Sequence, residues 1–390
     1  GVTDSNFNSL RWGLDNWIHG ANGGNGGRIR FSRNNGLAIP LRNLDFRFRP
    51  NTHQLETTSQ TGGGFGLVFN EWGHSFTTYN IDYLQQRIIP QKYIDRAQNL
   101  RSFEATKNIS VHGKMARIFP IAEAETRVNH PEQAGYFSSA GGMGYLGIAG
   151  YPGDLSGSVF VCDVVGNLIH RNLLKLNGGA HIAMRSPIEK TSEFFASSDN
   201  HFRPVALELG PDGALYIADM QRAIIEHPDY IPSKIKQGKN IREGENRGRV
   251  YRIAPKPNFS QAISKSKPVK LANLEQEFAS PNQWRRLTAQ RLIYESQDKS
   301  LTPRLRELIS HKSDFARLHA LWSLQGLGIV RSGDLLLGLS DPNPRIRENV
   351  IRLVEESGMI GDQLIHQKLV DLAKDTDSTV RFQLALTLGK

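Results

Sequence analysis

The sequence of 390 residues has one cysteine, Cys162, and no long apolar run. A single cysteine excludes an intramolecular disulfide, a CxxC metal site and c-type haem attachment within these residues, and it leaves the redox compartment open. No stretch of about 18 apolar residues occurs, so no segment has the pattern of a transmembrane helix. The chain begins without a charged-then-apolar leader and partway through a strand pattern, so we expect the natural protein to start earlier.

Glycine is abundant instead, with 37 Gly and 18 Pro in a chain that is 38% hydrophobic, as in turn-rich β structure. The clearest unit is 202–253, which contains FRPVALELGPDGALYIADM and ends on GRVYRI. It predicts two strands around the turn 210–213, then a loop rich in chargeable groups, then a closing strand. This is the pattern of a propeller blade.

The same unit recurs upstream, which indicates a repeat architecture. Related strand and turn patterns lie at 13–20, 65–76 and 151–163. Further strands, supported by alternating β-branched and aromatic residues, are predicted at 44–48, 86–89, 167–173 and 248–253.

The pattern becomes helical after about Lys270, with apolar residues three and four apart. Ser280-Pro281 predicts a helix start, and an arginine recurs at spacings of 31, 30 and 34 residues, at 286, 317, 347 and 381. This favours an α-solenoid of HEAT-like repeats. The prediction is all-β then all-α: a β-propeller of about four blades at 1–257, a linker at 258–279 and a HEAT-like α-solenoid at 280–390 whose C-terminus also looks cut.

Positive charge is concentrated between Lys234 and Lys270, where eleven Lys and Arg face two Glu, giving +9 of the total +10. Such a stretch could attract nucleic acid or another polyanion. The reading we favour is a solvated loop and linker, because no stacking aromatics interleave with the charges.

Several motifs together resemble a known family. They are GLDNWIHGANG, FGLVFNEWGHSFTTYN, YPGDLSGSVFVCDVVGNLIHRNLL, EFFASSDNHFRPVALELGPDGALYIADM, and IIEHP followed by GRVYRI. The chain is identified by them as similar to the large membrane-associated dehydrogenase-like family of planctomycetes and verrucomicrobia. That family resembles soluble quinoprotein glucose and sorbosone dehydrogenases, with a six-bladed propeller followed by HEAT-like repeats. The resemblance therefore implies that 1–257 is a partial six-bladed β-propeller whose N-terminal blades are missing.

The resemblance implies oxidation of a sugar or other alcohol with pyrroloquinoline quinone and Ca²⁺, in a periplasmic or other extracytoplasmic compartment. Electrons would pass to a cytochrome c domain outside this chain, which has no haem site of its own. The histidine that acts as general base in the quinoprotein sugar dehydrogenases corresponds here to Ser5, which has no basic nitrogen.

Two arginines are candidate cofactor-binding residues. Arg203 precedes the first strand of the last blade, where its guanidinium could hold a quinone carboxylate in a bidentate fashion, or could instead form a salt bridge between blades. Arg222 lies in the loop that follows the second strand.

Acidic groups and histidines supply the catalytic and metal candidates. Asp219, Glu226 and His227 lie within one loop and could bind Ca²⁺ or act as acid and base, with Asp219 and Glu226 as metal ligands; alternatively Asp219 only caps the turn. His130 could be a channel residue that acts with them in catalysis, although a lone His before Pro is commonly a loop residue.

The leading functional prediction is therefore a quinoprotein-type sugar or alcohol dehydrogenase-like propeller. The alternative is a non-catalytic scaffold, whose channel binds a glycan or other small ligand and whose solenoid docks a protein. Ser5 favours the second prediction, and the loop from Asp219 to His227 favours the first.

Overall fold

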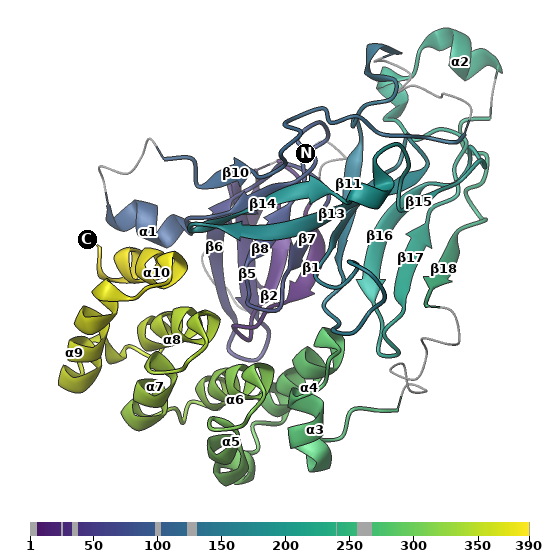
Figure 1. The fold of residues 1–390 in the computed structure, drawn as a ribbon. Helices are drawn as coiled ribbons and strands as arrows, with labels where there is room; N and C mark the ends of the chain where they lie inside the picture. Colours follow the sequence, from purple (N-terminus) through teal and green to yellow (C-terminus); the bar gives the residue numbers. More distant parts are fainter. Residues whose placement is uncertain are drawn as a thin grey trace.

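The computed structural model describes residues 6–24, 26–32, 38–97, 103–122, 131–238, 240–255 and 267–389. A β-rich part and a helical part lie side by side, and the helices form an arc beneath the sheets (Figure 1). No helix in these ranges has both the length and the apolar character that a bilayer crossing requires.

Four antiparallel sheets form a β-propeller-like arrangement, and each contains one of the four units predicted from the sequence. The sheets consist of β1 (Asn8–Trp12), β2 (Ile18–Ala21), β5 (Leu44–Arg49) and β6 (Gln54–Gln60); β7 (Leu67–Phe69), β8 (Ser75–Thr77), β9 (Gln85–Arg87) and β10 (Thr106–Asn108); β11 (Ala140–Tyr145), β12 (Val159–Asp163), β13 (Leu168–Asn177) and β14 (Ala180–Arg185), with β15 (Phe195–Ala196) on β13; and β16 (Pro204–Leu209), β17 (Leu215–Asp219) and β18 (Arg249–Ile253). A small ribbon pairs β3 (Arg28–Ile29) with β4 (Ile39–Pro40). We refer to the four sheets as blades 1 to 4.

The turn between the first and second strand has the same geometry in every blade. In blade 1 the amide of Gly13 donates to the carbonyl of Trp17, and the amide of Asn16 donates back to Gly13. The residue before the closing position has a positive φ each time, and it is Asn16, Gly73, Gly157 or Gly213. Glycine and asparagine tolerate this conformation best, so they mark the turn in the sequence.

An ion pair joins this turn to the third strand in three of the four blades. The arginines occupy the same register: Arg47 lies opposite His19, Arg171 opposite Phe160 and Arg252 opposite Tyr216. The pairs are Asp15–Arg47 at 2.7 Å, Asp154–Arg171 at 2.8 Å and Asp212–Arg252 at 2.8 Å. We call this contact the turn–strand ion pair.

Blade 2 departs from the pattern, because Gln86 stands at the arginine position, opposite Phe76. Its turn carries Trp72, which stacks on Phe315 of the helical part with ring centroids 5.1 Å apart. The turn of blade 2 is therefore held by the helices rather than by its own third strand.

Glycines let the innermost strands approach one another closely. A Cβ at Gly142 of β11 would lie 2.1 Å from the carbonyl oxygen of Val205 in β16. Blades 1 and 2 are joined differently, by an ion pair between Asp45 and Arg87 whose side chains are 0% and 3% exposed. The propeller core is therefore closed both by backbone proximity and by buried charge.

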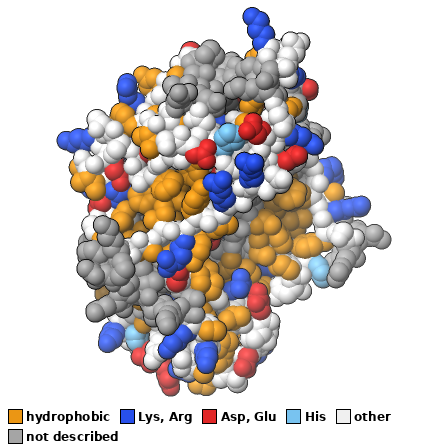
Figure 2. All heavy atoms as spheres, turned by 90° about the vertical axis from the view of Figure 1, so that its right-hand side faces the viewer, with side chains coloured by type: hydrophobic (Ala, Val, Ile, Leu, Met, Phe, Trp, Pro, Cys, Tyr) orange, Lys and Arg blue, Asp and Glu red, His pale blue; other side chains and the backbone are white. Residues whose placement is uncertain are grey.

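Blade 4 carries exposed apolar side chains. Figure 2 views the molecule from the right-hand side of Figure 1, where this blade lies, and shows hydrophobic side chains gathered in patches. Val250 of β18 is 70% exposed. Part of the apolar surface of blade 4 is thus not covered by the described residues.

The helical part is built from consecutive antiparallel pairs. Its helices are α3 (Leu274–Phe278), α4 (Gln283–Ser296), α5 (Thr302–Leu308), α6 (Asp314–Gly326), α7 (Ser332–Leu339), α8 (Pro344–Glu356), α9 (Gln363–Asp371) and α10 (Ser378–Leu388). Two short helices, α1 (Gln91–Arg96) and α2 (Ser233–Gly238), belong to the β-rich part. The second helices of the pairs, α4, α6, α8 and α10, pack against one another in that order.

Two details differ from the sequence prediction. Helix α3 lies inside the segment predicted as a linker, and α4 begins at Gln283, capped by Asn282 rather than by Ser280. Asn282 outcompetes Ser280 because its side-chain oxygen accepts a hydrogen bond from the amide of Trp284, at 2.9 Å, two residues into the helix. The caps of α8 and α10 are Asn343 and Asp377.

The helices contact the first turn of every blade. Gln290 of α4 donates to the carbonyl of Leu14 at 2.7 Å, and Asn349 of α8 donates to that of Trp72 at 3.1 Å. The amide of Gln283 donates to Gly147 at 2.7 Å, and the Asn282 side chain donates to Gly210 at 3.0 Å. One end of the propeller is therefore covered by the helical part.

Candidate functional site

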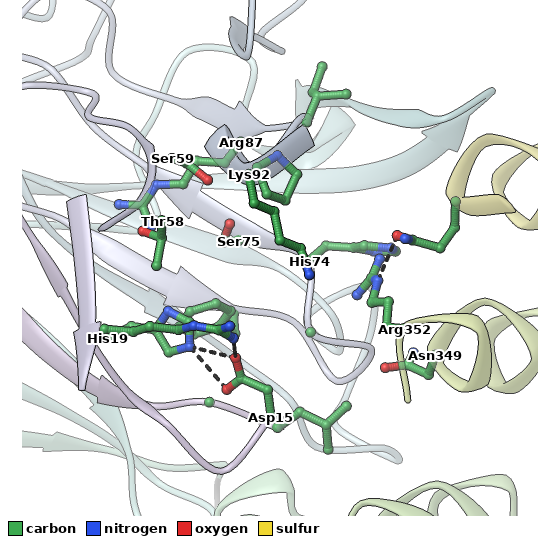
Figure 3. Close-up of a pocket in the computed structure, with 18 of the residues that line it drawn as sticks. Asp15, His19, Thr58, Ser59, His74, Ser75, Arg87, Lys92, Asn349 and Arg352 are labelled. Atoms are coloured by element: carbon green, nitrogen blue, oxygen red, sulfur yellow. Dashed lines mark hydrogen bonds and ion pairs between the residues drawn. The ribbon is translucent and has the colours of Figure 1, made fainter. Parts of the chain in front are cut away.

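A cavity of about 510 Å³ lies where blades 1 and 2 meet α1, α8 and α10. Charged, polar and apolar side chains line it, and they come from segments far apart in the sequence (Figure 3). We call it the junction cavity. The residues that matter below are Asp15, His19, Arg47 and His74 from the blades, Lys92 and Tyr93 from α1, and Glu348, Arg352 and Gln383 from the helices.

The first functional group in the cavity is a histidine held by a carboxylate. Nε2 of His19 lies 3.0 Å from each oxygen of Asp15, and Arg47 donates to the same carboxylate at 2.7 Å. Burial alone would raise the pKa of Asp15, but His19 and Arg47 outweigh it and hold that pKa well below its usual range. Asp15 is therefore anionic at neutral pH.

Asp15 and Arg47 form the turn–strand ion pair of blade 1, so their local placement follows from the blade repeat. In blade 4 the equivalent set is Asp212, Arg252 and Tyr216, whose hydroxyl donates to Asp212 at 3.1 Å. Blade 1 differs in placing an imidazole where blade 4 has a phenol. Because the blade 4 set lies outside the cavity, it is a matched structural control.

The second histidine joins the propeller to the helical part. Nε2 of His74 lies 2.8 Å from Oε1 of Glu348 in α8. Burial would raise the pKa of Glu348, but His74, Arg352 and Arg345 outweigh it and lower that pKa to about 2. Glu348 is therefore ionised over the whole physiological range.

A third histidine lies behind His74. The ring of His181, on β14, has its centroid 5.0 Å from that of the His74 ring. The backbone amide of His181 donates to the side-chain oxygen Oε1 of Gln86 at 2.7 Å. Burial and the neighbouring His74 lower the pKa of His181 to about 3. His181 is thus neutral where an exposed histidine would begin to protonate.

This lowered pKa predicts acid sensitivity. His181 titrates near 6.5 when unfolded and near 3 when folded, so its neutral form favours the fold above pH 6.5, and that contribution is lost as pH falls towards 3. Between pH 7 and pH 5 we expect the protonation of His181 in the unfolded chain to lower the free energy of unfolding of the wild type by about 2 kcal/mol.

The His181→Gln variant should lose most of that dependence when urea unfolding is measured at both pH values. The window above pH 5 excludes Glu348, which starts to protonate in the unfolded chain only near 4.5. Burial also lowers the pKa values of His319 and His112, but both are present in wild type and variant, so the difference in pH slope between the two proteins reports His181. An unchanged pH slope in the variant would contradict the assignment.

All four cationic side chains that line the junction cavity are paired with carboxylates. Lys92 lies 3.2 Å from Glu355, and Arg47 contacts Glu56 at 2.5 Å and Glu356 at 3.2 Å in addition to Asp15. Arg87 pairs with Asp45, and Arg352 with Glu348. Five carboxylates line the cavity, from Asp15, Glu56, Glu348, Glu355 and Glu356, so the wall offers no excess positive charge.

The residues predicted from the sequence lie elsewhere, in the loops of blade 4. Arg203 is 2% exposed, and its guanidinium donates to the carbonyls of Arg222 at 2.9 Å, Val164 at 2.9 Å and Ala223 at 2.7 Å. Oδ1 of Asp219 accepts from the amides of Arg203 and Gln221, both at 2.8 Å. These contacts link the loops of blades 3 and 4.

The other candidates are spread along the same loop. The Arg222 guanidinium donates to the carbonyls of Met220 and Gln221, Glu226 accepts from the amide of His227 at 2.9 Å, and the His227 ring lies against Tyr230. Ser5 and His130 lie outside the described residues. The structure brings Arg203, Asp219 and Arg222 together and places none of them in the junction cavity.

These positions do not fit the quinone and Ca²⁺ that the family resemblance implies. The Arg203 guanidinium already donates to three carbonyl oxygens, so it cannot also grip a carboxylate without breaking them. Within the described ranges, no three His, Cys, Asp or Glu side chains are grouped as a metal site would need. We derive no step through either group.

The middle of the propeller is occupied by Arg11 of β1. Its guanidinium donates to the carbonyls of Leu67 at 3.2 Å, Met143 at 3.2 Å and Leu207 at 3.1 Å, one on the innermost strand of each other blade. The centre of the described blades is thus bridged by a side chain, and the larger polar space lies at the junction with the helices.

Sequence reasoning did not single out the residues of the junction cavity. His19 and His74 lie within the motifs that carry the family resemblance, and comparing the blade repeats would have drawn attention to both turns. Nothing in the sequence pairs His74 with Glu348, because 274 residues separate them and only the docking of α8 brings them together.

The fold defines the chain as a β-propeller-like protein with a helical part packed on one end. Residues 2–257 match a family described as a domain of unknown function, DUF7133. The chain therefore belongs to the DUF7133 family. The narrower membrane-associated family that the motifs resemble stays a prediction.

Comparison with solved structures gives a distant likeness to a crystal structure described as a "putative gluconolactonase". The two share 12% sequence identity over 56% of this chain and 72% of that one, with a TM-score of 0.26. No curated protein sequence is significantly similar to the chain. The function must therefore be argued from the site itself.

Proposed function

We propose that this protein binds a neutral, hydroxyl-rich ligand of the carbohydrate class in the junction cavity. One observation carries the proposal: charged side chains line the cavity, yet each of its four cations is already paired with a carboxylate. An anionic ligand would find no spare positive charge there, whereas hydroxyl groups can donate to the carboxylates. A volume of about 510 Å³ suits a small ligand.

The remaining wall residues are consistent with such a ligand. Tyr93, Phe69 and Trp322 offer ring faces and edges, against which the apolar face of a sugar ring can pack. Ser75 and Ser59 add hydroxyl groups (Figure 3). The combination of carboxylates, hydroxyls and aromatic rings supports binding of a polyol more than binding of a multiply charged cofactor.

The two carboxylate-held histidines give the site a capacity for proton transfer. Nε2 of His19 lies 3.0 Å from both oxygens of Asp15, so the imidazole is held in place beside the ligand, and histidine is the side chain that most often acts as an acid or base. The residues predicted to bind the quinone and Ca²⁺, which are Arg203, Arg222, Asp219 and Glu226, do not line the junction cavity. Binding is therefore the function proposed here, in line with the alternative that Ser5 favours.

We further propose that the stacked helix pairs are HEAT-like repeats. Arg317 and Arg347, which recur 30 residues apart, each pair with an aspartate ahead of the next second helix, at Asp341 and Asp375, both within 2.7 Å. In this proposal the helical part forms one wall of the ligand site, and its helix pairs stack through the same Arg–Asp contact in successive repeats.

The direct test is isothermal titration of the whole chain with a panel of neutral mono- and disaccharides, matched by their uronates and sugar phosphates. We expect a neutral member to bind and its charged counterparts to bind at least 10-fold more weakly. Asp15→Asn should weaken that binding about 10-fold or more, since a hydrogen bond to a charged group is worth about 1.5–3 kcal/mol.

Asp212→Asn is the matched control, because it removes the same turn–strand ion pair outside the cavity. Loss of binding because the Asp15 variant misfolds must be told apart from loss of a ligand contact. Lys92→Gln serves this purpose, because it changes a wall residue that is partly exposed. Equal weakening by Asp212→Asn, or preferential binding of the charged sugars, would overturn the proposal.

A further inference from the structure

A second hollow, of about 410 Å³, lies on the outer side of blade 3 and is separate from the junction cavity. It is formed by the segment 111–119 and by the end of β14 with the following 3₁₀ turn Pro187–Glu189. Its side chains include Arg117, Arg185, Lys190 and His112, together with Phe119 and Met184, and no carboxylate is among them. We call it the blade 3 hollow.

One of its cations is fixed in place. Arg185 donates to the carbonyl of Ser192 at 2.8 Å, to that of Arg117 at 2.7 Å and to the carboxylate of Glu193 at 3.1 Å. Glu193 itself is 0% exposed and also holds His170 at 2.7 Å. Arg185 is therefore paired with a buried carboxylate, and its position is set before any ligand arrives.

The other two cations have no acidic partner among the residues that the structure describes. Arg117 lies with its guanidinium carbon 5.7 Å from the centre of the Phe119 ring, and Arg185 lies 4.9 Å from the same ring. Lys190 is exposed and forms no ion pair within the described ranges. Both guanidiniums thus lie near the Phe119 ring, the one of Arg185 anchored and the one of Arg117 exposed.

The pKa of His112 reflects the electrostatic field in the blade 3 hollow. Burial, then Arg185 and His170, lower the pKa of His112 below its usual value. The electrostatic character is opposite to that of the junction cavity, where every cation is paired. An apolar surface next to uncompensated positive charge suits a ligand that carries both an anionic group and a flat apolar portion.

We propose that the blade 3 hollow binds an organic oxyanion, a carboxylate, sulfate or phosphate ester, whose charged group lies against Arg117 and Lys190 and whose planar or apolar portion packs on Phe119 and Met184. This site is independent of the carbohydrate proposed for the junction cavity. The ligand of the blade 3 hollow carries negative charge, whereas the carbohydrate proposed for the junction cavity is neutral.

The test uses the whole chain and three probes: phenyl phosphate, inorganic phosphate and phenyl β-glucoside, followed by NMR of the His112 ring. Phenyl phosphate should bind at least 10-fold more tightly than inorganic phosphate and should raise the pKa of His112, because the anion offsets Arg185. The uncharged glucoside should leave His112 unchanged. Equal affinity for the two phosphates, or a His112 response to the glucoside, would overturn the proposal.

Variants separate a built site from general attraction to a basic protein. Arg117→Gln and Lys190→Gln should each weaken the binding of phenyl phosphate about 10-fold, whereas Lys175→Gln should leave that binding unchanged. Lys175 is an exposed lysine on β13 of the same blade and does not line the hollow, so it removes the same charge elsewhere. Equal weakening by all three variants would show non-specific attraction and defeat the assignment. All three positions are exposed, so loss of folding is not expected.

Discussion

Gly142→Ala is expected to destabilise the propeller by more than about 3 kcal/mol, whereas Gly141→Ala should change its stability little. At Gly142 the added Cβ would lie 2.1 Å from the oxygen and 2.7 Å from the carbon of the Val205 carbonyl, and 2.8 Å from Cα of Ala206. These are backbone atoms of β16, so no side-chain rotation can relieve the clash. The innermost strands of blades 3 and 4 would have to move apart.

Gly141 is the control, because it is the next residue in the same strand and a Cβ there would meet nothing closer than 3.8 Å. The comparison requires thermal and urea unfolding of both variants, with circular dichroism to confirm β structure. Since both changes have the same chemistry, a difference between them measures the close approach of β11 and β16. Equal stability of the two variants would show that the strands are not packed this tightly.

Glu348→Gln is expected to cost about 3–5 kcal/mol at pH 7, because it removes the buried anion that Arg345 and Arg352 share and leaves Arg345 with Asp377 alone. The side chain is 3% exposed and contacts His74 at 2.8 Å and Arg345 at 2.5 Å, and it also pairs with Arg352. The amide can replace the geometry of these contacts but not the charge. The contact between blade 2 and α8 should weaken most.

The effect should depend on pH in a defined direction. The pKa of Glu348 is lowered from 4.5 to about 2 in the folded chain, so its contribution is complete above pH 4.5 and is lost as pH falls towards 2. The difference in unfolding free energy between wild type and variant should therefore be smaller when urea unfolding is repeated at pH 3. Glu295→Gln is the control, since that exposed residue pairs only with Arg291 at 3.6 Å and should change stability by less than about 1 kcal/mol. A constant gap across pH would contradict the prediction.

The local elements could be read from the sequence because they depend on neighbouring residues. The turn around Gly213 is recognisable from Gly-Pro-Asp-Gly between two alternating apolar runs, and the structure has this turn between β16 and β17. Asn343 and Asp377 are recognisable as helix caps because a cap needs only the amides two or three residues ahead. Such patterns led to the four blades and to the helical part.

The candidate site could not be read in the same way. Arg203 drew attention as a guanidinium at the start of a strand, but a sequence does not show which carbonyls will surround it, and here backbone oxygens from two blades do so. Tyr216 and His19 occupy equivalent positions in blades 4 and 1, yet only His19 faces a cavity. The difference arises from where the helices dock.

The sequence by itself determined the secondary structure, the repetition of the blade and the change from strands to helices, because these follow from periodicity, turn chemistry and capping within short segments. Only the tertiary structure decided which charged groups are compensated. Docking of α8 places Glu348 against His74, and the blade 3 hollow keeps Arg117 and Lys190 without a described partner. Electrostatic pairing depends on distances between residues remote in the chain, and those distances exist only after the blades and helices have packed.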